Sequence, residues 1–148
     1  MAVAVFDRIH TLDSVGLADV LAREATRAGR HLPVLVQVNV SGEAGKRGVA
    51  PAEVASLAEL VRGCPSLVVD GLMTIASVGV GPAEIRGQFR ALRKLRDATQ
   101  KRLGVELPHL SMGMSDDFEI AVEEGATMLR IGRALFGARG LRPWREGA

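Results

Sequence analysis

Two short stretches near the end of the chain decide its fold: Leu110–Asp117 (LSMGMSDD) and Leu129–Gly137 (LRIGRALFG). Each begins with an apolar run typical of a strand. Each continues into small residues, with a hydroxyl or a glycine where a helix is expected to begin. The first N–H groups of a helix have no partner and carry the positive end of its dipole, so they attract phosphate. Two such helix starts after adjacent strands can hold one phosphate between them, and Arg130 lies in the second strand.

The rest of the chain repeats this alternation of strand and helix. Strands are expected over residues 3–12, 32–40, 67–75, 109–114 and 128–131. Helices are expected over residues 15–28, 51–62 and 82–103, then up to 124 after a cap at Ser115-Asp116-Asp117, and over 134–139. We interpret residues 1–148 as a single domain with a loose tail at 141–148.

Five parallel strands alternating with helices place the chain in the α/β class, as a doubly wound sheet or as part of a (β/α)₈ barrel. A full barrel usually needs about 250 residues, so this chain is short by roughly three β/α units. Both architectures place ligand groups at the carboxyl ends of their strands. The last two of these ends coincide with the two stretches quoted above.

The composition narrows the class of protein. Aromatic residues make up 3% of the chain and the net charge is +2, which argues against a nucleic-acid surface. The longest apolar run, residues 32–40, is too short to cross a bilayer, and Asp7 and Arg8 come too early for a signal peptide. Cys64 is alone, which fits a reducing compartment. We therefore expect a cytoplasmic protein.

The sequence resembles the pyridoxal-phosphate homeostasis proteins, relatives of the alanine racemase barrel domain. The matching segments are the two opening stretches together with Ile9–Ser14 (IHTLDS), Val36–Gly48 (VQVNVSGEAGKRG) and Gly71–Ala76 (GLMTIA). The resemblance implies a partial (β/α)₈ TIM-type barrel of about five parallel strands, with pyridoxal 5′-phosphate (PLP) at its mouth. It also implies a protein that binds, buffers and hands over this cofactor, without established turnover of an amino acid.

The resemblance also implies roles for particular residues. Ser115 and the backbone of Gly132 and Arg133 would hold the phosphate, and Arg130 would face the pyridine nitrogen. Because an arginine stays protonated, it cannot take up the proton of that nitrogen, and the ring remains a poor electron sink. Asn39 and Met73 stand at strand ends that line the family's cofactor pocket. No catalytic residue and no metal ligand is assigned.

The chain departs from the family at one point. The family carries its cofactor on a lysine at the end of the first barrel strand, within an apolar-apolar-Val-Ser-Lys pattern, and this sequence has no such segment. The chain begins at what would be the fourth strand. Lys46 lies in a glycine-rich loop, and Lys94 and Lys101 lie on a solvated helix face, so none has the desolvated setting that favours an imine. We therefore expect non-covalent binding at best.

Simpler interpretations stay open for several residues. Ser115 on its own is a common helix N-cap, and His10 is more often structural than catalytic. Arg130 in an apolar strand is harder to explain structurally, because a buried arginine needs partners. Two other functions also stay open. The chain can be a truncated or split barrel subunit that associates with itself or a partner chain through open sheet edges, or a phosphate-binding barrel enzyme of other specificity, such as a sugar-phosphate isomerase.

Overall fold

The computed structural model describes residues 2–137, and the expected loose tail at 141–148 lies outside them. One sheet contains five parallel strands in the order β1-β2-β3-β4-β5. The strands are β1 (Ile9–Leu12), β2 (Leu32–Gln37), β3 (Leu67–Met73), β4 (His109–Met114) and β5 (Met128–Arg130). A doubly wound sheet reverses its strand order, whereas a barrel adds each strand beside the last. The sequential order therefore confirms the partial barrel.

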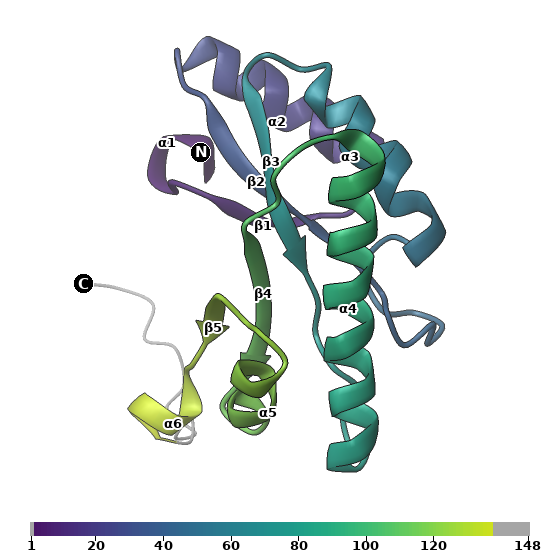
Figure 1. Ribbon diagram of the computed structural model, residues 1–148. Helices are drawn as coiled ribbons and strands as arrows, with labels where there is room; N and C mark the ends of the chain where they lie inside the picture. The colour runs from purple at the N-terminus through teal and green to yellow at the C-terminus, as the bar shows by residue number, and fades with distance from the viewer. Residues whose placement is uncertain (1, 138–148) are drawn as a thin grey trace, which may run out of the picture.

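Helices connect these strands. They are α1 (Ala2–Val5), α2 (Val15–Arg27), α3 (Val54–Arg62), α4 (Pro82–Leu103), α5 (Phe118–Glu123) and α6 (Arg133–Phe136), with a 3₁₀ turn at Pro51–Glu53 before α3. Figure 1 shows α2, α3 and α4 together on one side of the sheet. We call the face of the sheet toward these helices the outer face and the opposite one the inner face. In the described residues, no helix combines the length and apolar character that a membrane crossing requires.

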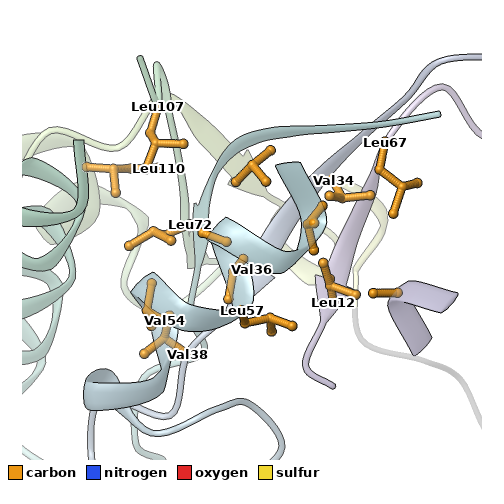
Figure 2. Close-up of a cluster of buried hydrophobic side chains, with 14 of the residues drawn as sticks. Leu12, Val34, Val36, Val38, Val54, Leu57, Leu67, Leu72, Leu107 and Leu110 are labelled. Atoms are coloured by element: carbon orange, nitrogen blue, oxygen red, sulfur yellow. The ribbon is translucent and has the colours of Figure 1, made fainter. Parts of the chain in front are cut away.

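The hydrophobic core lies between the outer face and the helices. Alternate residues of β2 (Leu32, Val34 and Val36) are fully buried there. Figure 2 shows Val34 and Val36 with side chains from α3 and the neighbouring strands. Phe89 of α4 closes the core from the helix layer and is also fully buried. Burying apolar area at about 25 cal/mol per Å² makes this layer the main source of stability.

The beginning of the chain differs from the prediction. Residues 3–5 belong to the short helix α1 and not to a strand, and β1 begins only at Ile9. The reason is the length of the neighbouring strand. Ile9 pairs with Val34, and β2 begins at Leu32, so residues 3–5 have no strand beside them to supply hydrogen bonds. They satisfy their backbone groups in a helical turn instead, which buries Val3.

Three other strands end earlier than expected, at Gln37, Met73 and Arg130. At the end of β2, the backbone forms hydrogen bonds with the loop that follows it. The N–H of Val49 donates to the carbonyl of Gln37 at 2.9 Å, and the N–H of Asn39 donates to the carbonyl of Val49 at 3.0 Å. The last helix also differs, because α6 spans Arg133–Phe136, and residues 138 and 139 of the expected helix are not among those described.

The inner face carries most of the polar side chains of the sheet. The pairing register shifts between Ile9 and Leu12, between Val34 and Leu35, and between Ser111 and Met114. Such irregularities bend strands and re-aim side chains. The shift opposite Val34 and Leu35 makes Asp70 the extra residue of β3. Its carboxylate meets the Arg8 guanidinium at 2.5 Å and lies 3.7 Å from Nε2 of His109.

Candidate functional site

The loops after β4 and β5 lie side by side, because Met114 and Arg130 pair in register at the ends of these strands. Between them is a hollow of about 680 Å³, within the usual range for small-molecule sites. Both loops and α6 contribute to its walls, which are formed by Met114, Ser115, Asp116, Arg130, Gly132, Arg133, Phe136 and Gly137. The two stretches that stand out in the sequence therefore line one common hollow.

The hydroxyl of Ser115 joins the two loops. Its Oγ accepts a hydrogen bond at 3.1 Å from the N–H of Ala134, in the first turn of α6. Within the predicted cap at Ser115-Asp116-Asp117, the N-cap position of the following helix, α5, falls on Asp117 and not on Ser115, because α5 begins at Phe118. A hydroxyl that accepts one bond still has its own proton to donate. Ser115 can therefore donate to an oxygen of an anion in the hollow.

A tight turn after β4 presents Ser115 in this way. The carboxylate of Asp117 does not cap α5; its Oδ1 accepts a 2.6 Å hydrogen bond from the N–H of Met114. Just before the turn, Gly113 has φ +95°, and a Cβ there would lie 2.6 Å from Cβ of Ala121. Only glycine adopts this conformation freely and leaves room for the contact. The residue thus allows α5 to pack closely against the end of β4.

The start of α6 supplies the opposite wall. Gly132 precedes the helix and Arg133 is its first residue, so their N–H groups have no carbonyl acceptor within it. The Arg133 guanidinium forms an ion pair with the carboxylate of Asp116 on the other loop. Both side chains are well exposed, and exposed ion pairs contribute little stability. This pair can therefore open at little cost when another anion competes for Arg133.

Arg130 is fixed at the floor of the site by two neighbouring strands. Its NH1 donates to Oγ of Ser111 in β4 at 2.8 Å, and its NH2 donates to the carbonyl of Thr74, just after β3, at 2.9 Å. Burial lowers the pKa of the guanidinium, and the charge of nearby Asp117 partly opposes this. Arginine nevertheless remains protonated in proteins. The site thus holds a fixed positive charge.

Asn39 and Met73 are not among the residues that line this hollow. The side chain of Asn39 is engaged in its own loop, where Nδ2 donates to the carbonyl of Glu43 at 2.9 Å and Oδ1 accepts from the N–H of Gly42 at 3.1 Å. Met73 is buried and pairs in register with Ser111. It therefore adjoins the residue that holds Arg130, while Asn39 organises the loop after β2.

None of the three lysines lines the hollow. Nζ of Lys46 donates to Oε1 of Glu43 at 2.9 Å and to Oγ of Ser77 at 3.2 Å, so this ammonium group is held in an ion pair between two loops. Hydrogen bonds from Ser77 and Lys46 lower the pKa of Glu43, which keeps the pair charged. Lys94 and Lys101 are exposed on α4. The structure therefore offers no lysine beside Ser115 and Arg130.

Sequence reasoning did not assign three residues of the strands to the site, and it interpreted one of them, His10, as more often structural. Ser111 and Thr74 bind the Arg130 guanidinium, and Nδ1 of His10 in β1 lies 3.0 Å from Oγ of Ser111. The available signal was the alternation in β4, where His109 and Ser111 are polar and Leu110 and Met112 are apolar. A period of two places the polar pair on one face. Which other strands would face that pair could not be predicted from spacing.

A second hollow, of about 550 Å³, lies between α2 and α3. Its polar lining includes the carboxylates of Asp13 and Glu53 but no arginine or lysine. This makes it a poor site for an anion, so we place the candidate site at the ends of β4 and β5.

Comparison with known proteins identifies the family of the chain. The family model described as "Alanine racemase, N-terminal domain" matches residues 2–140. A pyridoxal phosphate homeostasis protein of Aquifex aeolicus is 49% identical over 131 residues, which cover 88% of this chain and 58% of that protein. Its counterpart in Bos taurus is 45% identical over 148 residues, covering 94% and 53%. The chain thus spans little more than half the length of these relatives.

Several solved structures share the fold of this chain. PipY of Synechococcus elongatus without PLP superimposes with a TM-score of 0.86 at 37% identity, covering 92% of this chain and 64% of PipY. PipY with PLP bound gives a TM-score of 0.83 at 36% identity, covering 92% and 63%. An alanine racemase from Corynebacterium glutamicum, at 20% identity and a TM-score of 0.69, shares the fold.

Proposed function

This chain belongs to the alanine racemase N-terminal domain family, and we propose that it binds PLP non-covalently in the hollow between the loops after β4 and β5. One observation carries the proposal: the Ser115–Ala134 hydrogen bond joins the two loops at the hollow that Arg130 of β5 also lines. The relatives that carry the name pyridoxal phosphate homeostasis protein support the choice of ligand. We assign the chain a role in maintaining the cellular supply of PLP, in the cytoplasm, where the free thiol of Cys64 stays reduced.

The residues of the hollow fit a phosphate ester. The Ser115 hydroxyl can donate one hydrogen bond, and the N–H groups of Gly132 and Arg133 can donate two more at the positive end of α6. The Arg133 side chain adds a mobile positive charge nearby. Hydrogen bonds to a charged phosphate are stronger than hydrogen bonds between two neutral groups. We therefore propose that these three residues hold the phosphate.

Arg130 lies deeper and suits the ring end of the same ligand. We propose that it faces the pyridine nitrogen, because its guanidinium is held by Ser111 and Thr74 and remains charged. Bound PLP supplies an aldehyde for reaction with amines and a ring that can accept electrons. A guanidinium beside the ring nitrogen donates a hydrogen bond but cannot take up its proton. This arrangement holds the cofactor without promoting that chemistry, as a carrier requires.

Titration of the purified chain tests the proposal. We expect PLP to change its absorption on binding with one site per chain, pyridoxal to bind at least tenfold more weakly because it lacks the phosphate, and inorganic phosphate to compete. Borohydride treatment of the complex should leave no stoichiometric adduct on any lysine. Absence of saturable binding would overturn the proposed ligand, and a reduced adduct on one lysine would overturn the non-covalent mode.

A pair of serine variants locates the site. Ser115→Ala removes the hydroxyl that joins the loops, and we expect PLP affinity to fall about tenfold, the loss of one charge-assisted hydrogen bond. Ser14→Ala is the matched control, because Ser14 caps α2 through the N–H of Leu17 at 3.3 Å and does not line this hollow. It should cost about 1 kcal/mol of stability without changing affinity. Equal affinity losses in the two variants would refute the location.

A second candidate property is association through the open sheet edges, with a second copy or a chain that completes the barrel. Within residues 2–137, β1 pairs only with β2 and β5 only with β4. Large apolar side chains are exposed near both edges: Val5 and Phe6 before β1, and Leu129, Leu135 and Phe136 at β5 and α6. Unpaired edges and exposed apolar patches both favour association. These features support the proposal that the sheet associates through its edges.

Light scattering over a concentration series tests this association. We expect a mass above that of one chain at high concentration, and a shift toward the monomer in Phe136→Ser, whose parent side chain is 86% exposed. Val78→Ser is the control, because Val78 is equally exposed but lies in the loop between β3 and α4. A monomer at every concentration would exclude self-association.

A further inference from the structure

Ser111 stands between two charged or chargeable groups on the inner face. It is fully buried in β4, and its Oγ accepts from NH1 of Arg130 at 2.8 Å while Nδ1 of His10 lies 3.0 Å away on the other side. A guanidinium has no acceptor atom, so the serine oxygen must accept from Arg130. The serine proton can then be donated to Nδ1 of His10 when His10 is neutral and carries its own proton on Nε2.

The contact depends on the curvature of the sheet. His10 is in β1 and Ser111 in β4, three strand positions apart. Adjacent strands lie about 4.8 Å apart, so a flat sheet would separate the two by about 14 Å. A 3.0 Å contact therefore shows that the sheet curls as a barrel does and turns both side chains inward. His10 reaches the holder of Arg130 from the far edge of the sheet.

We infer that His10 is a positioning residue that acts through Ser111 to hold the Arg130 guanidinium in the orientation that faces PLP. This rests on the proposed function. When His10 is neutral, Ser111 donates to it and turns a lone pair to Arg130. When His10 is protonated, Nδ1 becomes a donor, the serine proton loses its acceptor, and two positive charges share one hydroxyl. PLP affinity then falls.

The surroundings of His10 keep it neutral near pH 7. Burial lowers its pKa below the ordinary value of 6.5, and the positive groups of Arg130, Arg8 and His109 act in the same direction, while Asp70 opposes them. Protonation of His10 is therefore confined to acid solution. The affinity of the site is expected to be lost as the pH falls through that lowered pKa, and to be complete above it.

Two variants separate the acceptor atom from the bulk of the side chain. His10→Asn keeps an acceptor oxygen close to the position of Nδ1 and does not titrate, whereas His10→Leu keeps the bulk and removes the acceptor. We expect PLP affinity to fall about tenfold in His10→Leu and to stay within about twofold of the parent in His10→Asn. Equal affinity in parent and His10→Leu, or equally weak affinity in both variants, would overturn the inference.

The pH dependence of PLP affinity distinguishes a positioning role of His10 from a purely structural one. The phosphate of PLP also titrates near pH 6, and it contributes equally to every variant. The parent should therefore lose affinity more steeply than His10→Asn as the pH falls below 6.5, and superimposable profiles would contradict the inference.

A measurement without ligand keeps the inference separate from the proposed function. Nitrogen-15 NMR of the chain should show His10 as the Nε2–H tautomer at pH 7.5 and a sharp guanidinium signal for Arg130. Both His10→Leu and Ser111→Ala should broaden the Arg130 signal by freeing its rotation. An unchanged Arg130 signal in both variants, or an Nδ1–H tautomer, would overturn the inference. If PLP fails to bind while these signals behave as expected, the proposed function fails and the positioning link stands.

Discussion

The two faces of the sheet use the same strands for opposite purposes. The outer face places Val34, Val36 and Leu72 under the helices, where all are fully buried. The inner face places His10, Ser111 and Arg130 together in a hydrogen-bonded chain. Because side chains alternate along a strand, each strand can serve a dry core and a polar site at once. Stability and ligand binding should therefore respond to different residues.

The outer layer should show the largest effect. Phe89→Ala removes a fully buried ring from α4, and we expect it to lower the free energy of unfolding by about 3–5 kcal/mol. Urea unfolding followed by circular dichroism measures this. PLP affinity of the remaining folded protein should not change, since Phe89 does not line the site. A loss below about 1 kcal/mol would mean that the helix layer is not the main source of stability.

Among the described residues, Glu124 is a buried charged side chain that packs against α4. Its side chain is 4% exposed, and it meets Arg86, Arg90 and Arg93 of α4. Hydrogen bonding from Arg90 lowers the pKa of Glu124, burial opposes this, and Arg86 lowers it further. Glu124→Gln should cost about 1–3 kcal/mol at neutral pH, measured by urea unfolding.

The sign of the pH effect follows from the direction of this shift. Because the folded-state pKa lies below the ordinary 4.5, the contribution of Glu124 is complete above pH 4.5 and is lost as the pH falls through the folded value. The parent should therefore lose its advantage over Glu124→Gln in acid. A constant difference between the two proteins from pH 7 to pH 3 would show that the carboxylate charge is not what matters.

The inner face should show a smaller effect on stability. Asp70→Asn keeps the shape of the side chain but removes the charge that faces Arg8 and His109. Since these groups are partly exposed, we expect a loss of about 1 kcal/mol or less, seen as a small decrease in the urea midpoint. A loss comparable to that of Phe89→Ala would erase the distinction between the two faces.

The rim of the site should show the smallest effect. Asp116→Asn frees Arg133 from its exposed ion pair and removes a negative charge from the wall of the hollow. We expect PLP to bind about two- to threefold more tightly, with stability unchanged, and the gain to shrink in high salt. Weaker PLP binding in this variant would show that Asp116 orients Arg133 for the ligand and does not compete with the phosphate for the guanidinium.

Elements with strong local signals could be predicted from the sequence. Ser14 caps α2, Pro82 begins α4, and the span of β4 is as expected, because capping groups, proline and an apolar strand pattern act within a few residues. The predicted start of β1 was wrong for a non-local reason. Residues 3–5 can form a strand only if β2 extends beside them, and β2 begins at Leu32. Four of the six predicted site residues line one hollow, and they lie in two local motifs that the sequence could identify: Ser115, Arg130, Gly132 and Arg133.

The sequence by itself determined the alternation of strands and helices and the two helix starts with their anion-binding groups, since these follow from neighbouring residues. Only the tertiary structure decided that Ser115 caps α6 and not α5, and that His10 meets Ser111 across three strand positions. The Ser115–Ala134 contact joins residues 19 positions apart, and the His10–Ser111 contact joins residues 101 positions apart. They exist because parallel strands end at one edge and the sheet is curved, and no spacing within a single segment encodes that curvature.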